Sequence, residues 1–118
     1  MAILRELQAM VRAGQGFSAV TPMPVLVRAD ADFHRALYRL SGNQALTEMT
    51  EPMWPHLMRS MASVLVLPDY ANLVWQDQHP AILDAIITGD AARSAAAAEA
   101  HAASAARLTA ERLQPKAA

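Results

Sequence analysis

Residues 24–41 read PVLVRADADFHRALYRLS, and the spacing of their apolar side chains predicts one amphipathic helix. Asp30 and His34 are four residues apart, so their side chains share one face of this helix. That face is the apolar one. A carboxylate and an imidazole there need partners, because a buried charge without a partner is costly. The opposite face carries a charged stripe of Arg28, Asp32, Arg35 and Arg39.

Glycine and proline divide the rest of the chain into further helical segments. Residues 3–13 have helical periodicity, and Gly14 is expected to stop that helix. Pro24 suits the first turn of the second helix, which should end near Ser41. Two residues mark the next boundary, Gly42 as a left-handed C-cap and Asn43 as an N-cap.

The second half of the chain continues this helical pattern. Residues 44–67 are predicted to be helical with a kink or short break at Pro52 and Pro55. A helix should begin between positions 69 and 79 and run to Thr88. A last helix, 91–113, has Asp90 as its N-cap and Pro115 as its stop. No alternating strand pattern occurs, so the fold class is all-α with five or six helices.

Composition narrows the class of protein. The 118 residues form one domain, 1–118, with 53% hydrophobic and 18% charged residues and a net charge of −1. These values favour a folded globular chain over a disordered one or an electrostatic nucleic-acid binder. Because cysteine is absent, disulfides, thiol catalysis and zinc–thiolate sites are excluded. No apolar run approaches the ~18 residues of a membrane span, so we expect a cytoplasmic protein without a membrane partner.

Two later histidines also fall on inward faces. His79 shares its predicted face with Ile82 and Ile86, and His101 lies among alanines. Each histidine alone would be interpreted as a hydrogen-bonded core residue. Together with Asp30 and His34 they also fit a shared metal site, because neutral imidazoles and a carboxylate bind Zn, Ni, Mn or Fe. Both interpretations stay open on spacing alone.

His56 lies on the polar side of its segment, and we expect it at the surface. Arg59 falls on that same side. The chain has no glycine-rich phosphate loop, no HExxH and no G-x-S-x-G. The charged stripe around Asp32 holds too little positive charge for a DNA-reading surface.

Several motifs resemble the ligand-binding domain of FadR-type GntR transcription regulators, the FCD domain. The first is Asp30-x-x-Phe33-His34-x-x-Leu37, followed by Ser41-Gly42-Asn43-x-x-Leu46. The second is His79-Pro80-Ala81-Ile82-Leu83-Asp84-Ala85-Ile86, followed by Gly89-Asp90. His101 occupies the position of the family's last histidine. The four ligand positions are separated by 4, 45 and 22 residues, and the resemblance covers residues 3–113.

The resemblance implies an antiparallel helical bundle that senses a small carboxylic acid. Its metal ligands would be Asp30, His34, His79 and His101, holding a divalent ion (Zn, Ni, Mn or Fe) at the bottom of a cavity. Arg59 occupies a position where family members often carry an arginine, which makes it a candidate for binding the effector carboxylate. Such domains are regulatory rather than enzymatic, and they dimerise.

The resemblance does not extend to two parts of these regulators, the winged-helix DNA-binding domain and the first helix of the FCD domain. We therefore expect no direct DNA binding by this chain. A bundle short of one helix exposes an apolar stripe, so we expect a homodimer or association with another chain.

Two other functions are compatible with the same residues. A metal-assisted hydrolase or lyase would need a general base near the metal. The acidic residues that could fill that role are Glu48, Glu51 and Asp84, and all three are expected to face solvent. A ligand-free helical interaction module would instead be insensitive to chelators, and its histidine substitutions would cost only packing energy.

Overall fold

The computed structural model describes residues 2–113, and every regular element in that range is helical. The elements form five helical rods, two of them composite. They are α1 (Ala2–Gln15), α2 (Met23–Ser41), α3 (Gln44–Thr50) with the 3₁₀ turn η1 (Glu51–Met53) and α4 (Trp54–Leu65), α5 (Pro68–Leu73) with the π-helical turn η2 (Val74–Gln78) and α6 (His79–Ile87), and α7 (Ala91–Leu113). The predicted all-α class is confirmed.

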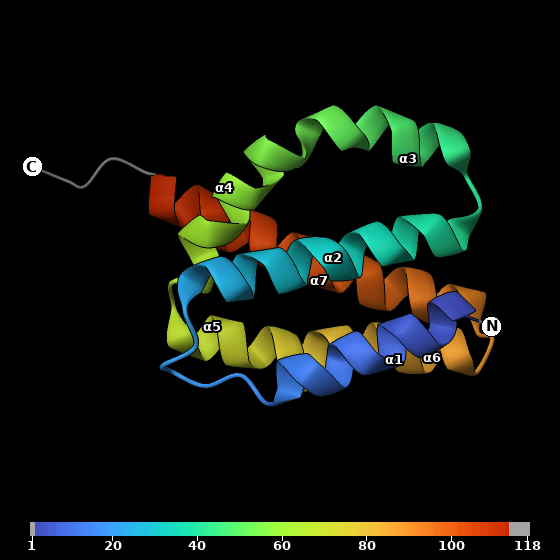
Figure 1. Cartoon of the computed structure of the whole chain (residues 1–118), viewed down its shortest axis with the longest axis horizontal. Coiled ribbons are helices and arrows are strands. Elements are labelled where there is room, and N and C mark those ends of the chain that lie inside the picture. The colour runs from blue at the N-terminus through green and yellow to red at the C-terminus, as the bar shows by residue number, and fades with distance from the viewer. Residues whose placement is uncertain (1, 114–118) are drawn as a thin grey trace, which may run out of the picture.

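Consecutive rods run in opposite directions (Figure 1). The α2 helix packs against α1 on one side and α4 on the other, and α7 packs against α6 and α4. The rod made of α3 and α4 therefore arches over α2 and α7, while α1 and the α5–α6 rod form the opposite layer (Figure 1). This arrangement is the expected antiparallel bundle.

The predicted boundaries around α3 are confirmed. Gly42 has φ 72°, and its N–H donates to the carbonyl of Arg39 at 3.1 Å. The side chain of Asn43 then accepts a hydrogen bond from the N–H of Leu46 at 3.1 Å. The predicted break appears as η1, which contains Pro52 and separates α3 from α4.

The last helix begins as expected and reaches the last described residue. Oδ1 of Asp90 accepts a hydrogen bond from the N–H of Arg93 at 2.9 Å, so Asp90 caps α7. The helix extends to Leu113. Pro115, its predicted stop, lies outside the described residues.

The expectation that Gly14 stops the first helix is wrong. The helix continues to Gln15, and Gly14 is buried inside it. A Cβ atom at Gly14 would lie 1.9 Å from Cε3 of Trp75. Gly14 is therefore needed for the close approach of the Trp75 indole to α1, and a helix-interior glycine is tolerated for that reason.

The helix that carries His79 begins slightly earlier than expected. The α5 helix starts at Pro68, whose fixed φ suits a first turn, and the rod continues through η2 into α6. Pro80 has no N–H to donate to the carbonyl four residues before it. The π-helical turn lies immediately before His79 and Pro80, so the rod changes its hydrogen-bond register where the proline would break it.

The charged stripe of α2 faces outward and forms ion pairs. Arg28 pairs with Asp32 at 3.4 Å within the helix. Arg39 reaches Glu6 at 3.2 Å, and Arg35 reaches Glu51 at the same distance. The inner face of α2 packs into a core whose largest fully buried side chains include Phe33, Trp54 and Trp75. Among residues 2–113, no helix is long and apolar enough to cross a membrane.

Candidate metal centre

The structure brings together the four residues that the sequence singled out. The α2 helix supplies Asp30 and His34, α6 supplies His79, and α7 supplies His101. One ligand atom from each residue lies within 4.8 Å of the ligand atoms of the other three. We call these four residues the Asp30 cluster. Ligand atoms from three helical rods therefore converge at one potential metal site.

Asp30 lies at the centre of the cluster. Its Oδ1 atom is 3.2 Å from Nε2 of His34 and 3.2 Å from Nε2 of His79. Nε2 of His34 lies 3.3 Å from Nε2 of His101. Asp30, His79 and His101 are buried, and His34 is half-buried. The cluster is therefore largely shielded from solvent rather than lying on the surface.

Several buried polar atoms of the cluster make no hydrogen bond. They are Oδ1 of Asp30 and both ring nitrogens of His79, a side chain that is 0% exposed. The 3.2 Å approach of Oδ1 to Nε2 of His79 is a close contact that lacks the geometry of a hydrogen bond. Buried polar atoms without a partner are rare in folded proteins and need an explanation. A divalent ion would give such atoms a partner, and a set of one carboxylate and three imidazoles is a common donor set for transition metals. The residues therefore fit a metal ion.

Gln78, which the sequence analysis missed, makes a hydrogen bond to the side of the His101 ring that faces away from His34. Its Oε1 accepts a hydrogen bond from Nδ1 of His101 at 2.6 Å, and its Nε2 donates to Oγ of Ser104 at 3.3 Å. Because an amide oxygen only accepts, we infer that Nδ1 of His101 carries the proton and that Nε2 keeps its lone pair. That lone pair is the one on the side of His34.

Aromatic packing fixes the orientation of the imidazoles. The His79 ring stacks on Phe33 with centroids 4.1 Å apart, and the Trp75 ring meets it edge-on at 4.4 Å. His34 and His101 stack on each other at 5.2 Å. Rings held in this way cannot rotate freely, so the donor atoms are preorganised.

The ionisation of the cluster suits metal binding. Burial raises the pKa of Asp30, but the contacts with His34 and His79 outweigh burial and hold the pKa well below its usual range. Burial lowers the pKa of His79, against the opposing effect of Asp30. Burial, followed by the charges of His79 and His34, lowers the pKa of His101 to about 4. At neutral pH Asp30 is therefore a carboxylate and His79 and His101 are neutral imidazoles, the forms that coordinate metals.

A cavity of about 630 Å³ extends from the cluster between α2, α4, α5, α6 and α7. This volume is in the usual range for small-molecule sites. Its lining residues are Asp30, His34, Leu37, Tyr38, Trp54, Leu57, Met61, Val64, Tyr70, Ile82, Ile86, Ser94, Ala95, Ala98, His101, Ala102 and Ala105.

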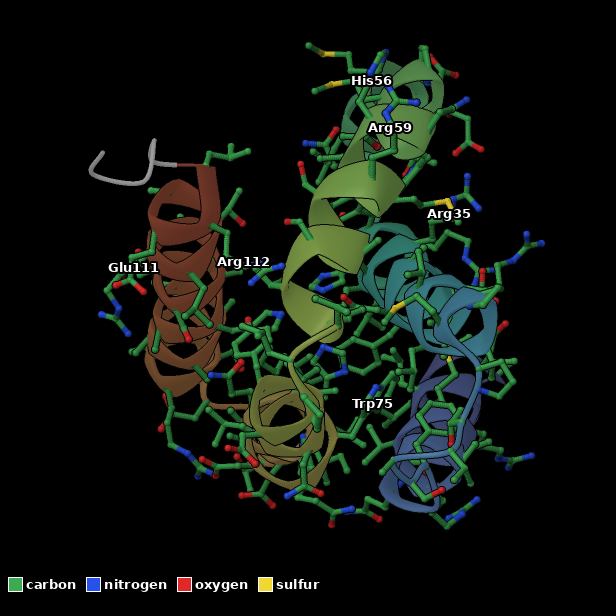
Figure 2. All side chains as sticks on the ribbon, turned by 90° about the vertical axis from the view of Figure 1, so that its left-hand side faces the viewer. Arg35, His56, Arg59, Trp75, Glu111 and Arg112 are labelled. Carbon is green, nitrogen blue, oxygen red and sulfur yellow. The ribbon has the colours of Figure 1, made fainter. Side chains whose placement is uncertain are left out.

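Arg59 lies away from this cavity. It is exposed on α4, where its guanidinium contacts Nδ1 of His56 (Figure 2). His56 is exposed, as expected. Arg59 is not among the residues that line the cavity, so its role in effector binding stays a prediction.

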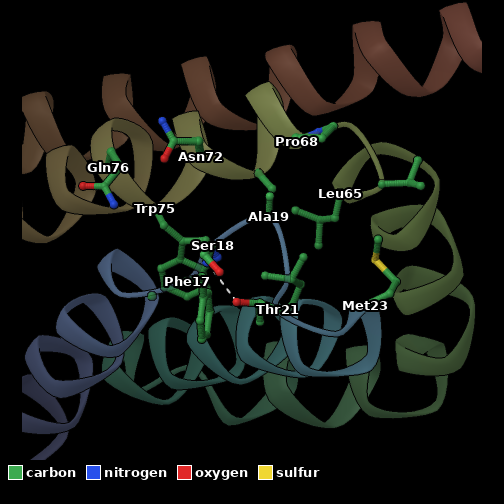
Figure 3. A pocket seen from close by; sticks show the side chains of 14 residues that line it. Phe17, Ser18, Ala19, Thr21, Met23, Leu65, Pro68, Asn72, Trp75 and Gln76 are labelled. Atoms are coloured by element: carbon green, nitrogen blue, oxygen red, sulfur yellow. Dashed lines mark hydrogen bonds between the residues drawn. The ribbon is translucent and has the colours of Figure 1, made fainter.

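A second cavity of about 290 Å³ lies between the 16–22 loop and the α5–η2 segment (Figure 3). The loop is held by the N–H of Ser18, which donates to Oγ1 of Thr21 at 2.8 Å. Trp75 lines this cavity and also packs on His79, so its indole separates the second cavity from the cluster. None of the four cluster residues lines it.

The family comparison agrees with this geometry. The model of the FCD domain matches residues 2–104. The chain belongs to the FCD domain family. FCD domains are the ligand-binding domains of FadR-type GntR regulators, and they are regulatory domains rather than enzymes. The matched range includes all four residues of the Asp30 cluster and contains no DNA-binding domain. No curated protein and no solved structure matches the chain significantly.

Proposed function

We propose that this FCD domain is a metal-dependent sensor of small carboxylic acids in GntR-type transcription regulation. One observation carries the proposal: ligand atoms of the four cluster residues converge, and three of these residues, Asp30, His34 and His101, line the 630 Å³ cavity. A cavity with potential metal ligands in its wall is suited to bind an anionic small molecule.

Asp30, His34, His79 and His101 would hold the ion, and Gln78 would fix the tautomer of His101. The ion, whether Zn, Ni, Mn or Fe, would supply a Lewis-acid position for a carboxylate oxygen. The chain's own residues would orient the metal ligands and enclose the effector. The aromatic rings would keep the imidazoles in place, and the cavity wall would surround the remainder of the effector.

The signal would pass from the cavity to a partner chain. The cavity is lined by residues of α2, α4, α5, α6 and α7, so a bound effector would contact several helices at once and change how they pack. We propose that a homodimer, or a complex with another chain, reads this change. Arg59 remains a candidate contact for the effector, and its guanidinium would have to leave His56 to act there.

Metal analysis tests the proposal. Protein purified without chelator should contain about one divalent ion per chain, as expected for one set of four ligands. Asp30→Ala and His101→Ala should lose the ion and melt at a different temperature from the parent. His56→Ala is the matched control, because His56 is exposed and outside the cluster. A metal-free parent whose variants melt as it does would refute the site.

A further inference from the structure

Beyond the Asp30 cluster, the wall of the 630 Å³ cavity is apolar. Leu37, Leu57, Met61, Val64, Ile82 and Ile86 all line it. Within residues 2–113, no lysine or arginine is among the lining side chains. A second carboxylate on a ligand would therefore lose its water without gaining a counter-charge, which is strongly unfavourable.

Alanines on α7 keep the cavity wide along one side. Ala95, Ala98 and Ala102 line it on the same helix as His101. From His101 to Ser94, at the other end of this run, the helix rises about 10 Å. The cavity therefore has the length for an extended tail whose head lies at the cluster.

Two buried donors in the wall have no partner. They are the hydroxyl of Tyr70 and Nε1 of Trp54, side chains that are 6% and 2% exposed. The Tyr70 hydroxyl lies beside the side chain of Ser104, and the charge of Asp30 also acts on it. The hydroxyl of Ser94 is already used, since it donates to the carbonyl of Asp90 at 2.8 Å. These donors are too few for a ligand with many hydroxyl groups.

We propose that the effector is a monocarboxylic acid with an extended apolar tail, rather than a dicarboxylic or polyhydroxy acid. The carboxylate binds at the Asp30 cluster. The tail lies along the alanines of α7, against the side chains of α4 and α6. This inference rests on the proposed function, because the metal anchors the head.

Calorimetry on the metal-loaded full chain tests the proposal with acetate, butyrate, hexanoate, octanoate and decanoate. Burial of each added methylene should tighten binding about fourfold until the cavity is filled. Suberate, which matches octanoate in length but carries a second carboxylate, and gluconate, which carries hydroxyl groups, should bind no more tightly than acetate.

A pair of variants locates the tail. Ala98→Leu should weaken octanoate binding about tenfold by filling the cavity, while acetate binding stays unchanged. Ala96→Leu is the matched control, because Ala96 is exposed on α7 and does not line the cavity. Equal effects of both substitutions would overturn the placement of the tail on α7.

The outcomes separate this inference from the proposed function. A metal-loaded protein that binds the whole series equally, or prefers gluconate or suberate to octanoate, overturns the apolar tail alone. A protein that takes up no metal overturns the proposed function and the anchor of the head with it.

Discussion

Oε1 of Gln78 lies 2.6 Å from Nδ1 of His101, while Nε2 of the same imidazole lies beside His34. This hydrogen bond leaves Nε2 of His101 free to bind a metal. Residues that orient metal ligands in this way commonly affect affinity by 10–100-fold.

Gln78→Leu should therefore weaken metal binding by about 10–100-fold without removing a ligand. Competition with a chromogenic chelator measures the affinity. Gln76→Leu is the matched control, because Gln76 is exposed and its Nε2 donates to the backbone carbonyl of Gln15 instead. Equal metal affinity of parent and Gln78→Leu would show that Gln78 does not orient His101.

Gly14→Ala should destabilise the fold by about 1–3 kcal/mol or more, since the new Cβ would overlap the Trp75 indole. The loss is measured as the free energy of unfolding in urea. Gly16→Ala is the matched control: its Cβ would lie 3.4 Å from the nearest atom, the carbonyl oxygen of Ala13. That substitution should be neutral or slightly stabilising. Equal stability of the two variants would contradict the packing of Trp75 on α1.

The metal-free protein should lose stability as the pH falls from about 6.5 to about 4. The folded pKa of His101 is lowered to about 4 from 6.5, and that of His79 is lowered as well. In this window the unfolded chain binds more protons than the folded one, so protons favour unfolding. Asp30 contributes outside this window, because its pKa is lowered from 3.8.

Urea unfolding at several pH values, with EDTA present, measures this dependence. His101→Gln should reduce the slope between pH 6.5 and 4, because one of the two histidines with lowered pKa is gone. A free energy of unfolding that is constant or rises as the pH falls would contradict the burial of neutral imidazoles.

Metal ions should stabilise the fold by linkage. Zn²⁺ at 100 times its dissociation constant should add about 2.7 kcal/mol to the free energy of unfolding. A thermal melt with EDTA, and then with excess Zn²⁺, measures the shift. His79→Ala should abolish the response, whereas His56→Ala should keep it in full. A response that persists in His79→Ala would point to surface binding instead.

Part of this site was predictable from helical periodicity. The spacing in α2 places Asp30 and His34 on the inner face, and the same argument places His79 and His101 inward on their own helices. Periodicity cannot say which helices are neighbours, because that depends on the packing of the whole bundle. The family resemblance supplied this information, and the structure brings the four residues together.

Other features of the structure could not be predicted from the sequence. Gly14 has the local pattern of a helix stop, and only the tertiary contact with Trp75 explains its place inside α1. Gln78 has no sequence signal beyond its position next to His79. It reaches His101 from η2 across to α7, a contact between residues 23 positions apart. Arg59 was selected by family position alone, and its exposed contact with His56 depends on the direction of α4 after two prolines.

The most direct test of the central claim is a crystal structure of metal-loaded protein with data at the absorption edge of the ion. The account predicts an anomalous difference peak bonded to Asp30, His34, His79 and His101, with metal–nitrogen distances of about 2.0–2.1 Å for zinc. No peak at the cluster, or a peak only at His56 or another surface residue, would contradict it.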